Sequence, residues 1–164
     1  VVIGDGGDEL SYRNLDIVFG LARGGAELIA MHRNPWWITP KGPTLDSGAL
    51  VVGLEFALGR SATIAGKPSP VVFRQAVREL AGEIAGAGGP RLRRAEVAMV
   101  GDDLAADVRG AQRAGLRGIL VLSGKTDRAA LDASSAARGK APDGVSPGVL
   151  DVVTALLEGR RTAR

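Results

Sequence analysis

The sequence contains no cysteine and a single histidine, and aromatic residues make up only 4% of it. The lack of cysteine excludes disulfides and thiolate metal sites, and it fits a reducing, cytoplasmic environment. With His32 as the only histidine and no serine or cysteine in a suitable context, the sequence offers no catalytic triad. Few aromatic rings also mean few platforms on which nucleic-acid bases could stack.

Long apolar runs are also missing. No stretch approaches the length of a membrane-spanning helix, and no basic segment followed by an apolar one resembles a secretory leader, so we expect no membrane partner. The 21 Lys and Arg residues are scattered among 18 acidic residues and give a net charge of +3, which does not predict a nucleic-acid partner. With 45% hydrophobic residues in 164, the chain is expected to fold into one domain, or one domain and part of another.

Segments typical of strands and helices alternate along the chain, which predicts an α/β fold with a parallel sheet flanked by helices. We expect strands at 1–4, 27–31, 61–65, 97–100 and 118–122. We expect helices at 11–23, 47–58, 70–80, 104–114, 127–137 and 146–157, with Ser11, Ser47, Ser69 and Asp127 as N-caps. Turn residues predict loops at 32–43 and 139–144, and the Gly-, Ala- and Arg-rich segment 82–94 is expected to be a mobile surface excursion.

The strongest functional pattern is an apolar run, 97–100, that ends at Gly101 and is followed by Asp102, Asp103 and Asp107. Ligands of open α/β sheets bind at the carboxyl ends of the strands, where Asp102 and Asp103 are expected. Asp107 follows one helical turn later and can face the same site. Neighbouring carboxylates favour a hard cation such as Mg²⁺, although an N-cap within a solvated turn is an alternative with about equal weight.

A second candidate site is Lys67, which follows another predicted strand and precedes a helix that begins at Ser69 and Pro70. A lysine beside a helix N-terminus suits a phosphate group, although taken alone an ordinary surface lysine is the simpler interpretation. Lys67 and Asp102 together would place a cation and a metal-binding acid at one edge of a sheet, as phosphoryl transfer requires.

Two other patterns carry less weight. Gly124, Lys125 and Thr126 look like the end of a phosphate-binding P-loop, but the required first glycine falls at Ile119. The segment 1–7 resembles a strand that ends in a nucleophilic aspartate, Asp5, but a glycine replaces the partner acid two residues later, at Gly7.

Taken together, the motifs resemble the haloacid dehalogenase superfamily of Mg²⁺-dependent phosphohydrolases, in particular the large-cap subgroup of NagD-type and p-nitrophenyl phosphatases and of phospholysine phosphohistidine inorganic pyrophosphate phosphatase. The likeness is carried in order by 28–34, 66–69, 101–107, 110–115 and 119–125. It implies a Rossmann-like core, a three-layer α/β/α arrangement, preceded by part of an α/β cap domain, with residues 1–59 in the cap and 60–164 in the core.

The resemblance also implies roles for single residues. Lys67 would neutralise the phosphate and the nucleophile, Asp102 would help hold Mg²⁺, and Asp103 and Asp107 would position the metal or its waters. The loop that begins with His32, Arg33 and Asn34 would face a small phosphorylated substrate, and cap-mediated homodimers are plausible in this subgroup.

The family's catalytic segment, Asp-x-Asp-Gly, which holds the nucleophile and the acid/base, does not occur in the 164 residues. We therefore expect a C-terminal fragment of a phosphatase with little or no turnover by itself. Alternatives are a non-catalytic binding or regulatory module, a subunit of a split enzyme, and a receiver-like signalling domain, the last disfavoured by the cap-like first third.

Overall fold

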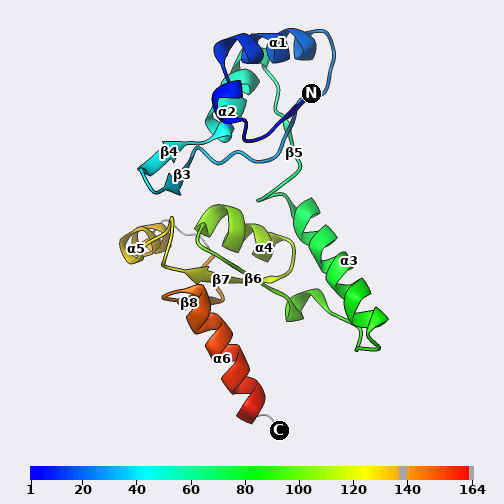
Figure 1. Ribbon diagram of the computed structural model, residues 1–164, viewed down its shortest axis with the longest axis vertical. Coiled ribbons are helices and arrows are strands. Elements are labelled where there is room, and N and C mark those ends of the chain that lie inside the picture. Colours follow the sequence, from blue (N-terminus) through cyan, green and yellow to red (C-terminus); the bar gives the residue numbers. More distant parts are fainter. Residues whose placement is uncertain (137–139, 163–164) are drawn as a thin grey trace. The chain divides into compact units, whose positions relative to one another are not determined.

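The computed structural model describes residues 1–136 and 140–162 (Figure 1). The chain forms two compact units, residues 1–72 and 73–164, and each is described by itself. In the part described, every helix is too short or too polar to cross a membrane.

The first unit is built on a parallel sheet in the order β1 (Val2–Ile3), β2 (Ile29–Ala30) and β5 (Thr63–Ile64). Besides the short turn η1 (Gly7–Glu9), its helices are α1 (Tyr12–Arg23) and α2 (Ser47–Leu58). Apolar side chains from β1, from β2 and the residue before it, and from α2 form its core; they are Ile3, Leu28, Ala30, Val51 and Leu54. The expected strand and helix order of this part is confirmed.

The predicted loop at 32–43 is wrong in part, because its second half opens an antiparallel hairpin. Strand β3 (Trp36–Thr39) pairs with β4 (Gly42–Leu45), with Trp36 opposite Leu45. Gly42 has a φ of 98°, a left-handed conformation that suits glycine after the tight turn. Trp, Ile and Thr favour strands, but the turn residues on either side of them led to the prediction of a loop, and the short strand pair was missed.

Helix ends follow the expected chemistry with one correction. The Ser11 hydroxyl accepts a hydrogen bond from Asn14 N, which confirms it as the N-cap of α1. The N-cap of α2 is Asp46, whose carboxylate accepts from Ser47 N at 2.7 Å, so the prediction of Ser47 as the cap is wrong by one residue. Aspartate and serine are about equally good N-cap residues, and the two are adjacent at 46 and 47, so the sequence alone does not decide between them.

The second unit holds a parallel sheet in the order β6 (Ala98–Gly101), β7 (Arg117–Val121) and β8 (Gly144–Ser146). After β6 come a π-helical turn, η3 (Leu104–Val108), and α4 (Arg109–Arg113), which pack against β6 and β7. Leu104, Val108, Leu120 and Leu131 form the core of this unit. The remaining helices are α5 (Arg128–Ala136) and α6 (Val149–Thr162).

Three expectations for the second unit were wrong. Helix α3 (Pro70–Gly86) continues beyond Leu80, and η2 (Arg94–Glu96) follows, so much of the supposed excursion at 82–94 is regular. Strand β8 replaces the end of the loop expected at 139–144, and α6 begins at Val149 instead of at 146. Residues 137 and 139, at the borders of two expected elements, lie outside the described residues.

Strand β5 pairs with β2 in the first unit, and the chain passes from the first unit to the second after Val72, whereas the boundary between cap and core was expected at 59/60. Whether the two units correspond to cap and core stays a prediction.

Candidate functional site

The acidic residues follow the carboxyl end of β6, and the loop at 123–126 follows the carboxyl end of β7. The two strands are parallel, with Gly101 opposite Leu120 in the register. Because both loops leave the same edge of the sheet, side chains 20 or so residues apart in sequence meet there.

Asp102 is held by the loop after β7. Its Oδ2 accepts a hydrogen bond from Lys125 N at 2.7 Å, and its carbonyl accepts from Thr126 N at 3.0 Å. A Cβ atom at Gly124 would lie 2.1 Å from Asp102 Oδ2, so only glycine leaves room for this carboxylate. Within the described residues, Asp102 Oδ1 has no hydrogen-bond partner, and it is the oxygen that can contact a ligand.

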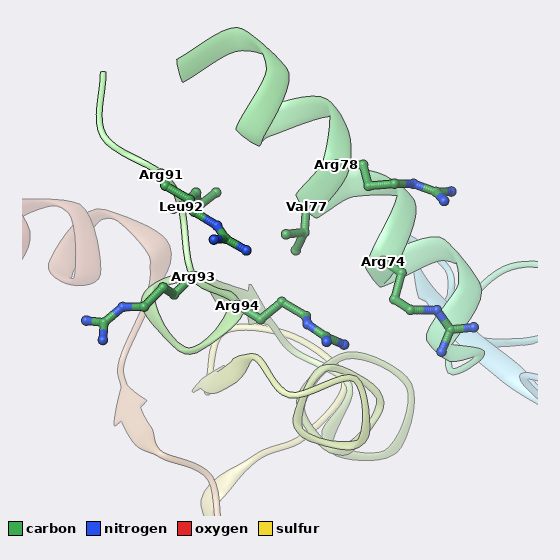
Figure 2. A pocket seen from close by; sticks show the side chains of 7 residues that line it. All are labelled: Arg74, Val77, Arg78, Arg91, Leu92, Arg93 and Arg94. Atoms are coloured by element: carbon green, nitrogen blue, oxygen red, sulfur yellow. The ribbon is translucent and has the colours of Figure 1, made fainter. Parts of the chain in front are cut away.

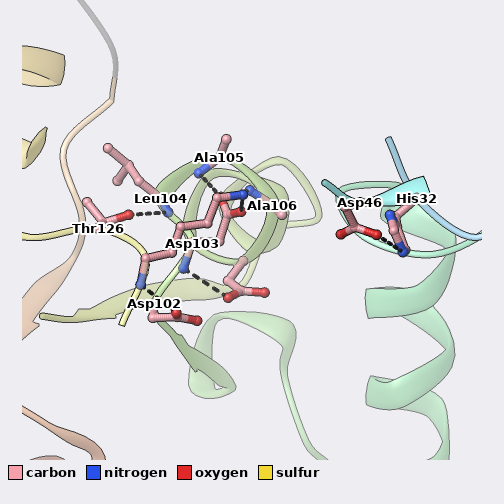
Figure 3. Close-up of polar contacts among 10 residues, drawn as sticks. His32, Asp46, Asp102, Asp103, Leu104, Ala105, Ala106 and Thr126 are labelled. Carbon is pink, nitrogen blue, oxygen red and sulfur yellow. Dashed lines mark hydrogen bonds and ion pairs between the residues drawn. The ribbon is translucent and has the colours of Figure 1, made fainter. Parts of the chain in front are cut away.

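Asp103 is fully engaged inside the protein (Figure 3). Its Oδ1 accepts from Ala105 N and Ala106 N, each at 2.9 Å, and its Oδ2 pairs with Lys125 Nζ at 2.8 Å. Burial alone would raise the pKa of Asp103, but the hydrogen bond and charge of Lys125 and the two backbone donors outweigh it and lower the pKa below its usual value. Asp103 is therefore the ionised N-cap of η3, as expected.

Asp107 is buried, with 4% of its surface exposed. Its Oδ2 accepts from Asp103 N at 3.2 Å, and a Cβ at Gly101 would lie 2.3 Å from the same oxygen. The buried Thr126 links the loop after β7 to the start of η3, because its hydroxyl accepts a hydrogen bond from Leu104 N at 3.2 Å (Figure 3). The side chains after β6 and β7 thus form one hydrogen-bonded cluster.

The fit of this cluster to a metal ion is partial. Among the described residues, no three His, Asp, Glu or Cys side chains converge in a way that could hold a metal ion. Asp103 does not fit the ligand role, because helix donors and Lys125 occupy both of its oxygens. Asp102 does fit, since Lys125 N fixes its Oδ2 and no hydrogen bond within the described residues occupies its Oδ1.

The remaining candidates lie in the first unit. Exposed Lys67 follows β5 and precedes α3, which begins at Pro70 as expected. The expected proximity of Lys67 to Asp102 stays a prediction, because the two belong to different units.

The segment after β2 is tied to α2 by its own side chains. His32 Nε2 lies 3.6 Å from Asp46 Oδ1, and Arg33 pairs at 2.7 Å with buried Glu55 (Figure 3 shows the first pair). A Cβ at Gly48 would lie 2.3 Å from Asn34 O, so α2 packs directly on this backbone. These contacts are internal, and a substrate role for His32, Arg33 and Asn34 stays a prediction.

Comparison with known proteins identifies the family. The model of the HAD-hydrolase-like family matches residues 64–152, more than half of the chain. The chain belongs to the haloacid dehalogenase-like hydrolases.

Among curated relatives of this hydrolase-family chain, haloacid dehalogenase-like hydrolase domain-containing protein 2 from Bos taurus is 39% identical over 125 residues, which are 76% of the chain and 44% of the relative. Phospholysine phosphohistidine inorganic pyrophosphate phosphatase from Bos taurus is 35% identical over 127 residues, 76% of the chain and 43% of the relative. The chain thus spans less than half the length of these relatives.

Solved structures confirm the expected fold and subgroup. A p-nitrophenyl phosphatase from Archaeoglobus fulgidus is similar with a TM-score of 0.75 and 28% identity, covering 94% of the chain and 55% of that protein. A glycerol phosphate phosphatase from Mycobacterium tuberculosis, in complex with magnesium, is similar with a TM-score of 0.64 and 29% identity, covering 83% of the chain and 37% of that protein.

Sequence reasoning missed the contacts of the loop that follows β7 in this hydrolase-family chain. Gly124 and Lys125 were included in the family resemblance, and with Thr126 they were considered as a failed P-loop, but the contacts of this loop with Asp102, Asp103 and Leu104 were not predicted. The signal was present, since two consecutive parallel strands place their exit loops at one sheet edge.

Proposed function

We propose that this chain is the C-terminal part of a Mg²⁺-dependent phosphatase that hydrolyses a small phosphate monoester or pyrophosphate through an aspartyl-phosphate. The observation that supports this most is the rigid placement of Asp102 at the carboxyl edge of the sheet, with Oδ2 fixed by Lys125 N and Oδ1 open. Family membership and similarity to several phosphatases support the reaction class.

In this proposal each residue has a limited task. Asp102 would help hold Mg²⁺, which would supply charge neutralisation at the phosphate oxygens. Asp103 and Lys125 do not touch the substrate; they hold the loop, and with it Asp102, in one orientation. Lys67 neutralises the phosphate as a point charge. A cytoplasmic location and a homodimer stay predictions.

The nucleophile is proposed to come from an Asp-x-Asp-Gly segment, which the 164 residues do not contain. That aspartate attacks phosphorus and the alcohol or phosphate leaves; water then cleaves the acyl phosphate and releases inorganic phosphate. It follows that the 164 residues alone have little or no turnover.

The test begins with the natural polypeptide that contains these residues, whose intact mass and N-terminal sequence are determined. It is assayed with p-nitrophenyl phosphate and pyrophosphate, with Mg²⁺ and with EDTA, beside the 164 residues alone. We expect Mg²⁺-dependent hydrolysis only by a polypeptide that carries Asp-x-Asp-Gly, and its loss in Asp102→Asn. Appreciable Mg²⁺-dependent turnover by the 164 residues alone would contradict the proposal, and a native chain that starts near Val1 would point to a partner subunit or a non-catalytic module.

A further inference from the structure

Helix α3 and the segment 91–94 enclose a cleft of about 710 Å³ in the second unit, and the proposed reaction makes no use of it. Five of its seven lining residues are arginines and none is acidic; the residues are Arg74, Val77, Arg78, Arg91, Leu92, Arg93 and Arg94 (Figure 2). Such a concentration of one charge is unexpected in a chain whose 21 basic residues are otherwise mixed with 18 acidic ones.

The charge in the cleft is largely unbalanced. Arg93 pairs with Glu96 at 2.7 Å, and Figure 2 shows its side chain turned away from α3. Arg78 donates to the neutral side chain of Gln75. The other three arginines, Arg74, Arg91 and Arg94, form no ion pair with a carboxylate in the described part of the chain. Like charges held together repel one another, so an anionic ligand would be stabilised here.

Arginines line the cleft in two rows, one on α3 and one in the segment 91–94; in Figure 2 Arg94 is directed toward α3, whereas Arg78 points to the side of α3 away from that segment. Arg74 and Arg78 are four residues apart on α3 and therefore lie on one side of the helix, one turn from each other. The second row, Arg91 to Arg94, leads into η2. Buried Val77 and partly buried Leu92 lie between the guanidinium groups (Figure 2). One guanidinium group can donate two parallel hydrogen bonds to a phosphate, so Arg74, Arg91 and Arg94, which come from both elements, suit a ligand with several phosphates.

The cleft is separate from the acidic cluster. The segment 91–94 and η2 precede the amino end of β6, whereas Asp102 follows its carboxyl end. Four residues of extended strand at about 3.3 Å each place these two ends roughly 10 Å apart or more. A ligand in the cleft would thus occupy the edge of the sheet opposite the proposed reaction.

We propose that this arginine cleft is a binding site for a linear oligophosphate, the chemistry shared by inorganic polyphosphates and nucleoside triphosphates. It is a binding site and not a second catalytic site, since no carboxylate, histidine or other proton-transfer group lines it.

Isothermal titration calorimetry of the 164 residues in EDTA tests the proposal, because EDTA excludes binding through a metal at Asp102. The probes are tripolyphosphate, ATP, orthophosphate and a single-stranded oligonucleotide. The variant is Arg74→Gln with Arg94→Gln. Its matched control is Arg13→Gln with Arg128→Gln, which removes the same charge at exposed positions outside the cleft. Circular dichroism checks that both variants fold.

We expect tripolyphosphate to bind at one site, more tightly than orthophosphate, and the cleft variant to weaken binding at least tenfold while the control changes it less than threefold. ATP binding more tightly than tripolyphosphate would support the proposal and identify a nucleotide as the source of the phosphates. Asp102→Asn should bind unchanged, which separates this site from the proposed reaction. No binding of tripolyphosphate, an equal loss in the control, or tighter binding of the oligonucleotide would overturn the proposal.

Discussion

The carboxylate of Asp103, after the end of β6, forms an ion pair with Lys125 in the loop after β7. Its pKa is lowered in the folded protein, because Lys125 and two helix N–H groups outweigh the effect of burial. The ionised form therefore stabilises the fold above the ordinary pKa of an aspartate, and this contribution is lost as pH falls through the lower pKa of the folded state.

Asp103→Asn tests this charge while keeping a side chain that can cap the helix. At pH 7 we expect a loss of roughly 1.5 to 3 kcal/mol in the free energy of unfolding, the usual range for a hydrogen bond to a charged group. The difference from wild type should shrink as pH falls toward 3. Urea denaturation at several pH values measures it, with exposed Asp132→Asn as a control within about 0.5 kcal/mol of wild type. A difference independent of pH would mean that the charge contributes nothing.

Gly124→Ala tests the orientation of Asp102. The added Cβ would lie 2.1 Å from Asp102 Oδ2 and must displace the carboxylate. In the natural polypeptide we expect the Mg²⁺ concentration for half-maximal phosphatase activity to rise about tenfold or more, as for other residues that orient a metal ligand. Gly82→Ala in α3 is the matched control, because nothing lies within 4 Å of its Cβ. Unchanged Mg²⁺ dependence in Gly124→Ala would show that Asp102 does not hold the metal.

At this scale the sequence located the acidic residues but not their contacts. Asp103 could be predicted as an N-cap because capping depends on neighbours in sequence. Its pairing with Lys125 depends on which strand lies beside β6, and a single sequence does not contain that information until a topology is assumed.

At the scale of elements, β7 is the centre of the sheet in the second unit, and Leu120 in it is fully buried. Leu120→Ala should lower the free energy of unfolding by about 2–5 kcal/mol, because it leaves a cavity between β7 and η3. Leu150→Ala in α6, where the side chain is 77% exposed, should change it by less than about 0.5 kcal/mol. Circular dichroism in urea compares the two, and similar losses would contradict this description of the core.

Elements that follow a continuous apolar or capped pattern were predictable, and those built around turn residues were not. The four apolar residues at 97–100 and the five at 118–122 lie at β6 and β7, and the capped helices α1 and α5 begin where expected. The hairpin of β3 and β4 and the three-residue β8 were missed, since glycine and proline within or beside them are equally typical of loops. The pairing of β8 also depends on β7, which is distant in sequence.

On the scale of the whole molecule, the residues expected to act on one phosphate belong to two compact units, Lys67 to the first and Asp102 to the second. The order of motifs along the chain predicts a shared site; the family match across 64–152 contains both residues, and their action on one phosphate stays a prediction. Their proximity during turnover is a functional question that kinetics can answer.

Lys67→Met and Asp102→Asn, made separately and together in the natural polypeptide, provide the measurement. If both residues stabilise the same transition state, each single change should lower kcat/KM about 10²-fold or more. This is the usual loss of rate when one preorganised charged group at the reacting atoms is removed. The double variant should then be much less impaired than the product of the single effects, because groups that act as a unit are not additive. Lys41→Met, which removes an exposed lysine of the same unit, should leave kcat/KM unchanged. Losses that multiply in the double variant would mean that the two residues act independently. Full activity of Lys67→Met would mean that Lys67 is an ordinary surface lysine, and Asp102 would then be the only part of the proposed site still supported.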